Sequence, residues 1–240
     1  MVRRHPQVPA PQARALSIET RGGELEPVDF DGLLIHFDDR VLRPRAWTAE
    51  QSRWAASLLP DLPAGEVLEL CAGAGQIGLA AVARSQRLLV CVEADAVAAR
   101  YAVLNAARSG LADRVEVRET PMARALGRDE LFPLVVADPP WVRRTETARF
   151  PEDPLTAIDG GDDGLDVARE CVEVIGAHLA PGGAALLQLG STDQVDALHA
   201  ELAAAALRVA EVRDYPGGVL TLLARAGDVG GPRQTTLSTG

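Results

Sequence analysis

The sequence predicts an α/β fold whose sheet is doubly wound, mainly parallel and seven-stranded, with a C-terminal antiparallel hairpin. From Val67 onward, short apolar runs typical of buried strands alternate with stretches of helical periodicity. A glycine turn, Gly73-Ala-Gly75, joins the first apolar run to the first helix of this alternation. Near the C-terminus, Pro216-Gly-Gly218 separates two further apolar runs, which is typical of a hairpin.

The elements follow from these patterns in order. Upstream of the alternation we expect a short strand at Leu33–Phe37 and a helix over residues 49–59, with Thr48 as its N-cap. The strands of the sheet are predicted near residues 67–71, 87–93, 114–118, 132–137, 183–189, 207–214 and 218–225. The main helices between them are predicted near residues 76–84, 95–109, 163–179 and 192–206.

The composition favours one folded domain at residues 29–226. The chain has 240 residues, of which 47% are hydrophobic, enough for one well-buried α/β domain. Residues 1–28 are rich in Pro, Arg and Gly and predict a flexible N-terminal arm, and residues 227–240 predict a disordered tail.

Several functional classes are disfavoured by composition. No apolar run reaches the length of a membrane span, and Pro6-Gln-Val-Pro-Ala-Pro11 interrupts the place of a signal peptide, so we expect a cytoplasmic protein. The 3 cysteines and 4 histidines show no spacing for a metal site or a disulfide framework. A net charge of −10 argues against a large basic face for nucleic acid.

The first strand and its glycine turn indicate a nucleotide-like ligand. Glycines there allow the backbone to approach a ligand closely, although nicotinamide, flavin and S-adenosylmethionine (SAM) proteins all use such turns. Glu93 follows the second apolar run directly, and a carboxylate at that place can accept both ribose hydroxyls of an adenosine ligand. Asp95 is better interpreted as the N-cap of the next helix.

The most specific chemistry follows the fourth strand, at Asp138-Pro-Pro-Trp141. The two prolines fix the backbone and remove two donors, which leaves nearby carbonyls free to accept hydrogen bonds. Asp138 and the Pro139 carbonyl could accept both N–H bonds of a planar amino or amide group, with Trp141 stacked on its face. Such a slot favours methylation of nitrogen, because in-line placement supplies much of the rate without a strong base.

A long segment follows the slot directly and predicts a substrate-specific lid over residues 142–163. Arg143 and Arg144 could contact phosphates or a carboxylate of the acceptor, or they could be solvated charges on a mobile loop. Asp163 is expected to cap the helix that starts at Gly164.

Taken together, these motifs resemble those of HemK-type SAM-dependent methyltransferases, which include the enzymes that methylate a glutamine side-chain nitrogen of peptide-chain release factors. The matching segments are Val41-Leu-Arg-Pro-Arg-Ala-Trp-Thr48, Glu69-Leu-Cys-Ala-Gly-Ala-Gly75, Val92-Glu93, Asn105, Asp138-Pro-Pro-Trp141 and Asp159-Gly-Gly-Asp-Asp-Gly-Leu-Asp166. The resemblance covers roughly residues 30–225, and the Gly-Gly-x-Asp-Gly-Leu-Asp run is its most family-specific part.

The resemblance implies a class I methyltransferase fold with SAM across the ends of the first two strands. It implies that the methionine part of SAM lies on Glu69, Gly73 and Gly75, and the ribose on Glu93. Neighbouring positions complete the expected cofactor site, namely Cys71, Ala72, Ala94, Asp138 and, toward the adenine, Glu119 or the backbone beside it. The acceptor is expected in the slot of Asp138, Pro139, Pro140 and Trp141, with Thr48 and Arg143 as further substrate contacts.

Two departures from the family pattern keep the acceptor open. The glutamine enzymes carry Asn-Pro-Pro-Tyr, whereas Asp138 and Trp141 also resemble enzymes that methylate amines of adenine or guanine. The residues before the domain are too few for the helical domain that release-factor enzymes usually carry.

The leading prediction is therefore an N-methyltransferase acting on an amide or amino nitrogen of a protein or another macromolecule, most readily a protein side-chain amide. An exocyclic amine of RNA or DNA and a small metabolite are the alternative acceptors. A nicotinamide-dependent oxidoreductase, which predicts a Tyr-x-x-x-Lys or histidine-based site, and a non-enzymatic SAM-binding protein are the interpretations from other classes. The chain contains no lysine, which disfavours the first of these two.

Overall fold

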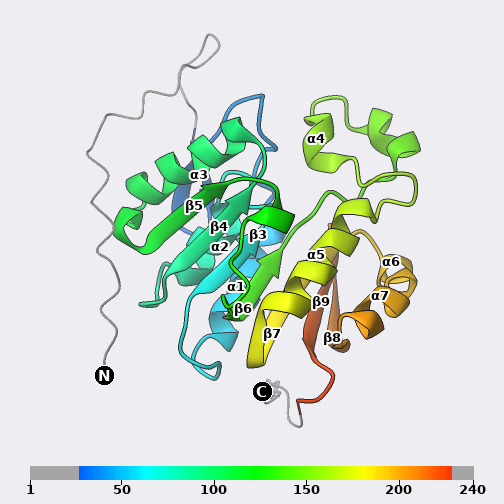
Figure 1. The fold of residues 1–240 in the computed structure, drawn as a ribbon. Coiled ribbons are helices and arrows are strands. Elements are labelled where there is room, and N and C mark those ends of the chain that lie inside the picture. The colour runs from blue at the N-terminus through cyan, green and yellow to red at the C-terminus, as the bar shows by residue number, and fades with distance from the viewer. Residues whose placement is uncertain (1–26, 229–240) are drawn as a thin grey trace, which may run out of the picture.

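The computed structural model describes residues 27–228, which form a seven-stranded sheet with helices on both faces (Figure 1). A separate small sheet pairs β1 (Pro27–Phe30) with β2 (Leu33–His36). The strands of the main sheet are β3 (Val67–Leu70), β4 (Leu89–Glu93), β5 (Val115–Glu119), β6 (Phe132–Ala137), β7 (Leu179–Leu189), β8 (Leu207–Tyr215) and β9 (Gly218–Arg225). The helices are α1 (Ala49–Leu58), α2 (Gln76–Val82), α3 (Ala96–Arg108), α4 (Leu155–Ile158), α5 (Asp166–His178), α6 (Thr192–Ala197) and α7 (His199–Ala204).

The strand order is β5-β4-β3-β6-β7-β9-β8. β5, β4, β3, β6 and β7 are parallel, whereas β9 pairs antiparallel with both β7 and β8. The chain moves outward from β3 to β5 and then returns to the other side of β3 as β6. This topological switch lies between β3 and β6, where open α/β sheets bind their ligands beyond the carboxyl ends of the strands. The predicted fold class and C-terminal hairpin are confirmed.

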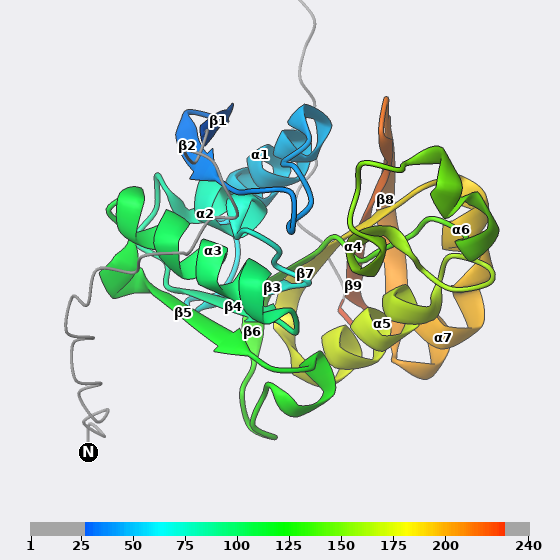
Figure 2. The same ribbon diagram turned by 90° about the horizontal axis from the view of Figure 1, so that it is seen from above.

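Two hydrophobic cores lie on opposite faces of the sheet. Helices α1, α2 and α3 cover one face, and α5, α6 and α7 cover the other (Figure 2). Because successive strand residues point to opposite faces, Val67 contributes to the first core and Leu68 to the second. The central strands are apolar on both faces and fully buried, which holds their carboxyl ends in fixed positions.

A buried asparagine fastens the N-terminal sheet to the glycine turn. The amide of Asn105 in α3 accepts the N–H of His36 at 2.8 Å and donates to the carbonyls of His36 and Ala74, each at 3.0 Å. Asn105 itself has 0% exposure. This contact explains the asparagine among the family-like motifs, since it joins three segments that border the site.

Several predicted boundaries need correction. Thr48 does not cap α1: its hydroxyl donates to the carbonyl of Arg45 at 2.9 Å, and its own backbone is helical. The helix predicted over residues 192–206 is two helices, because the backbone leaves helical geometry at Leu198. β7 begins earlier than predicted, with a bulge opposite Phe132 and Leu134 that accommodates its glycines.

The four-residue strand β1 and the four-residue helix α4 were not predicted. The predicted arm at residues 1–28 and tail at residues 227–240 lie almost wholly outside the described residues. The remaining short elements are 3₁₀ helices at Ala46–Thr48, Ala112–Arg114, Met122–Arg124 and Arg144–Arg149.

Candidate functional site

A cavity of about 460 Å³ lies at the carboxyl ends of four neighbouring parallel strands. Its wall is made by residues that follow β3, β4, β5 and β6, namely Cys71 and Gly73, Glu93 and Ala94, Thr120 to Met122, and Asp138 and Pro140. The topological switch between β3 and β6 is therefore the place where the cavity forms. We call it the first cavity.

The glycine turn after β3 is held by two carboxylates. Gly73 and Gly75 have φ angles of +55° and +80°, a backbone conformation that glycine adopts without strain. The N–H of Gly73 donates to the Glu93 carboxylate at 2.7 Å. A side chain at Gly75 would contact Ala102 of α3 at 3.2 Å, so the small residue lets α3 approach closely.

Glu69, which was expected beside the cofactor, lies behind this turn and is not among the residues that line the cavity. Its side chain is 2% exposed and accepts the N–H of Gly78 in α2 at 2.8 Å. The thiol of Cys91 also donates to it, at 3.2 Å. Burial raises the pKa of Glu69 to about 7. Its role is to satisfy a helix N–H inside the core and thereby fix the turn.

Glu93 stands at the end of β4 and lines the cavity at the place predicted for a ribose ligand. One carboxylate oxygen accepts from Gly73 and the other accepts the N–H of Asp95 at 2.8 Å. Burial raises the pKa of Glu93. Each oxygen keeps a lone pair for a further donor. Asp95 caps α3 as predicted, because its side chain accepts the N–H groups of Val97 and Ala98.

Only some of the other predicted cofactor residues line the cavity. Cys71 and Ala94 line the cavity, and Cys71 has a φ of +54°, which is unusual for a residue with a side chain. Ala72 is buried and, like Gly75, does not line the cavity. Glu119 is exposed on the edge strand β5 and does not line the cavity. The residues that follow it, Thr120 to Met122, form the cavity wall on that side.

A second cavity, of about 210 Å³, adjoins the first at the Asp-Pro-Pro-Trp segment. Asp138 and Pro140 line both cavities, while Pro139 and Trp141 line the second. Thr48, which is 5% exposed, also lines the second cavity. Arg143 is exposed and lines neither cavity. The structure thus brings all the predicted slot residues and Thr48 together and leaves Arg143 outside.

Asp138 is the polar group at the junction of the two cavities. Among the described residues, no side chain or backbone group forms a hydrogen bond with its carboxyl group, and burial raises its pKa to about 7. A desolvated carboxyl without a protein partner is costly unless a ligand supplies the hydrogen bonds. The position of Asp138 therefore indicates a ligand that carries N–H or O–H groups.

The Gly-Gly-Asp-Asp-Gly run packs against the backbone of the slot. A side chain at Gly160 would meet the Pro140 carbonyl at 2.7 Å, and one at Gly164 would meet the Trp141 carbonyl at 2.5 Å. Backbone packing this close requires glycine. Gly164 also has a φ of +81°. Contact with the slot therefore explains Gly160 and Gly164 of the family-like run, whereas a side chain at Gly161 would meet Asp166.

Gln194 of α6 completes this support and was missed by the sequence analysis. Its amide donates to the Trp141 carbonyl at 3.0 Å and accepts the N–H of Gly190 at 2.8 Å. Gly190 lies under the indole, because a side chain there would meet a Trp141 ring carbon at 2.5 Å. No local pattern marks these residues, since both approach Trp141 from a distant part of the chain.

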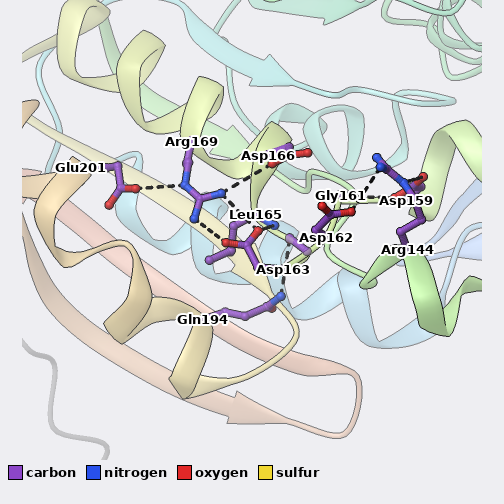
Figure 3. Close-up of polar contacts among 11 residues, drawn as sticks. Arg144, Asp159, Gly161, Asp162, Asp163, Leu165, Asp166, Arg169, Gln194 and Glu201 are labelled. Carbon is purple, nitrogen blue, oxygen red and sulfur yellow. Dashed lines mark hydrogen bonds and ion pairs between the residues drawn. The ribbon is translucent and has the colours of Figure 1, made fainter.

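The acidic residues of the run form ion pairs and do not reach the cavities. Asp163 accepts the N–H of Leu165 and pairs with Arg169, so it precedes α5, which begins at Asp166 and not at Gly164 as predicted. Arg169 also pairs with Glu201 of α7 (Figure 3). These contacts join α5 to α7 and lower the pKa of Asp163.

Other cavity residues were not expected because they come from segments without a regular pattern. Residues Arg40 to Leu42 line the first cavity from the N-terminal side, and Thr156 and Ala157 of α4 line it from the opposite side. Leu42 and Ala157 also line the second cavity. Val41 and Leu42 belong to the family-like segment Val41–Thr48, which was the signal available for them in the sequence.

Residues 27–228 contain no group of three or more His, Cys, Asp and Glu side chains arranged to hold a metal ion. No helix in that range is both long and apolar enough to cross a membrane.

Comparison with known proteins gives sequence relatives that include glutamine methyltransferases. The release factor glutamine methyltransferase of Deinococcus radiodurans is 33% identical over 214 residues, which cover 84% of this chain and 73% of the relative. The ribosomal protein uL3 glutamine methyltransferase of Bradyrhizobium diazoefficiens is 32% identical, with 71% of this chain and 58% of the relative covered. The release factor glutamine methyltransferase of Clostridium acetobutylicum is 29% identical, and the match covers 70% of this chain and 61% of the relative. The chain therefore spans less than two thirds of the last two relatives.

Solved structures show the fold. The ribosomal protein L11 methylase of Lactobacillus delbrueckii subsp. bulgaricus superimposes with a TM-score of 0.60 at 14% identity, over 85% of this chain and 91% of the other. The hMettl16 catalytic domain, solved with an RNA hairpin, gives 0.66 at 17% identity, over 84% and 77%.

A family model described as conserved hypothetical protein 95 matches residues 37–150, which include the glycine turn and the Asp-Pro-Pro-Trp slot. The HemK-type resemblance is thus confirmed by relatives that share most of the described domain. The chain belongs to the release factor glutamine methyltransferase family.

Proposed function

We propose that this protein transfers a methyl group from SAM to the side-chain amide nitrogen of a glutamine in another protein. The observation that carries the proposal is Asp138, an unpartnered carboxyl at the junction of two cavities. One cavity has the features of an adenosine site, and the other is a small slot beside two prolines and an indole. The family membership and the names of the relatives support the same reaction.

The first cavity fits SAM by the chemistry of its wall. Gly73 offers a backbone without a side chain, and Glu93 offers two oxygens with free lone pairs for ribose hydroxyls. The wall formed by Thr120 to Met122 suits the adenine, and Met122 gives it an apolar side. Cys71 and Ala94 complete the contact surface. When bound, SAM supplies a methyl group on a positively charged sulfur, which the acceptor nitrogen attacks.

The second cavity fits a planar amide. Asp138 and the Pro139 carbonyl accept its two N–H bonds, while Trp141 covers one face and Thr48 borders the slot. Holding both hydrogens in acceptors makes the nitrogen lone pair more available, and orientation toward the first cavity supplies much of the rate. The Pro-Pro segment keeps these acceptors in place, because it cannot rotate at φ.

Asp138 can also accept the proton that the nitrogen releases during the reaction. A new N–C bond forms as the C–S bond breaks, and the nitrogen then releases one proton. A desolvated carboxylate with a pKa of about 7 accepts that proton at neutral pH. The ionised form accepts both the hydrogen bond and the proton, so turnover is highest when Asp138 is ionised.

The acceptor is a component of the protein-synthesis machinery in the cytoplasm, by analogy with the relatives' substrates. A net charge of −10 disfavours a strong grip on a nucleic-acid backbone, which favours a protein over RNA. Arg143 is exposed beyond the slot, where it would contact the acceptor protein outside the glutamine itself.

The test is methyl transfer from labelled SAM to purified release factors, ribosomal protein uL3 and total RNA in parallel. The proposal expects label in protein, located to a glutamine by peptide mass spectrometry, and none with Asp138→Ala. Label in RNA alone would replace the glutamine acceptor with a base amine. Binding of NAD without binding of SAM would contradict the methyltransferase reaction altogether.

A further inference from the structure

The segment from residues 143 to 158, here called the lid, covers the second cavity opposite the N-terminal segment of residues 38–48. Phe150, Ala157 and Ile158 of the lid line the cavity on one side, and Leu42 and Trp47 line it on the other. The lid contains only a short 3₁₀ helix and the four-residue α4. Its backbone bonds to neighbours are at its two ends, where Val142 meets Ile158 and Arg144 meets Gly161.

One ion pair connects the middle of the lid to the N-terminal segment. Arg45 donates to both carboxylate oxygens of Asp153 at 2.5 Å, across 108 positions of sequence. The two side chains are only 25% and 6% exposed. Within residues 27–228 it is the one ion pair or hydrogen bond found between these two segments. Both residues line the second cavity.

The Arg45 side is itself anchored to the body of the protein. Its guanidinium lies 5.7 Å from the centre of the Trp47 ring. Trp47 in turn packs against Gly217 in the turn between β8 and β9, where a side chain would meet the indole nitrogen. The pair therefore links the lid to the edge of the sheet.

We propose that Arg45 and Asp153 are positioning residues that hold the lid over the acceptor and so set how tightly the acceptor binds. Removing one partner of a charge pair that is largely shielded from water is costly, because the other charge is left unpaired. Breaking the pair releases the wall formed by Phe150 and Ile158, which face the acceptor rather than the cofactor. The effect on the acceptor rests on the proposed function, whereas the hold on the lid does not.

The lid can be tested without any acceptor by limited proteolysis. It carries Arg143, Arg144 and Arg149, and the side chain of Arg149 is 71% exposed, so trypsin can cleave there. Asp153→Asn keeps every arginine and is expected to accelerate cleavage within the lid at least about fivefold. The matched control is Asp31→Asn, which breaks an Arg–Asp pair with Arg53 far from both cavities. Equal lid cleavage in the two variants would overturn the proposal.

The kinetic test is a double-mutant cycle with the acceptor protein. Arg45→Gln and Asp153→Asn are each expected to raise the acceptor KM at least about tenfold, with the Kd for SAM changed less than about twofold. The double variant is expected to be no worse than either single variant, because the same interaction is lost once. Additive effects, or equal losses of SAM and acceptor binding, would overturn the proposal. If the wild type transfers no methyl group to any protein, the proposed function fails, and the proteolysis result still decides the role of the pair.

Discussion

The first and second cavities are built in different ways. The wall of the first comes from the ends of four parallel strands, and its carboxylate, Glu93, is held by backbone N–H groups. The wall of the second comes from Asp138 to Trp141, the lid and the N-terminal segment, and its carboxyl group has no protein partner among the described residues. The shape of the cofactor cavity is therefore determined by the strands of the sheet, whereas the shape of the acceptor cavity depends on contacts between segments that are distant in sequence.

The largest effect that would sharpen this comparison is expected at Asp138. Asp138→Ala removes the acceptor of the amide N–H and should lower kcat at least about 100-fold, as the loss of one preorganised hydrogen bond at a reacting group does. The Kd for SAM should stay within about threefold, because the turn that holds the ribose is untouched. Kinetics and calorimetric titration on the same preparation measure both. Equal loss of binding and turnover would show that the two cavities are not separate in function.

A smaller effect is expected at Gly190, which lies beneath the Trp141 ring. Gly190→Ala must displace the indole, since the new methyl group would sit within contact distance of the ring. Overpacking of this kind costs about 1–3 kcal/mol of folding free energy, and acceptor turnover should fall about tenfold. Gly182→Ala, at a glycine of the β7 bulge, is the control for general destabilisation of that strand. If both variants lose stability and turnover in parallel, Trp141 has no special role.

The smallest of these effects concerns the cofactor side. Glu93→Ala should weaken SAM binding by about 1–3 kcal/mol, because it removes acceptors for the ribose and leaves the N–H groups of Gly73 and Asp95 without this partner. Glu119→Ala, at the end of the adjacent strand, is the matched control and should leave the Kd unchanged. Calorimetric titration with SAM distinguishes the two. If Glu93→Ala binds SAM with unchanged titration heats and Kd, Glu93 does not contact the cofactor.

Site residues that directly follow a strand were predicted from the sequence, whereas contacts between distant segments were missed. The glycine turn, Glu93 and the Asp-Pro-Pro-Trp segment each follow an apolar run, so strand periodicity alone placed them at one edge of the sheet. The contact of Glu69 with the cofactor came from the family resemblance, and a strand pattern does not reveal that its carboxylate accepts the N–H of Gly78 in α2.

The second cavity was harder to predict because long-range contacts complete it. Gln194 reaches Trp141 from 53 positions away, and Arg45 reaches Asp153 from 108. Neither contact leaves a periodic signal in the sequence. The family-like runs at Val41–Thr48 and Asp159–Asp166 marked these regions but did not show what they touch. The structure shows that both runs border the slot.

The most direct test of the account is the pH dependence of methyl transfer in the wild type and in Asp138→Asn. Burial raises the pKa of Asp138 to about 7, so the carboxyl group is protonated below that pH and ionised above it. Turnover should therefore rise with pH through about 7 and level off above it. Asp138→Asn keeps an accepting oxygen that does not titrate, so the variant should stay active and lose this rise. A wild-type profile that is flat between about pH 5 and 9, or an identical rise in the variant, would contradict the role of Asp138 at the junction of the two cavities.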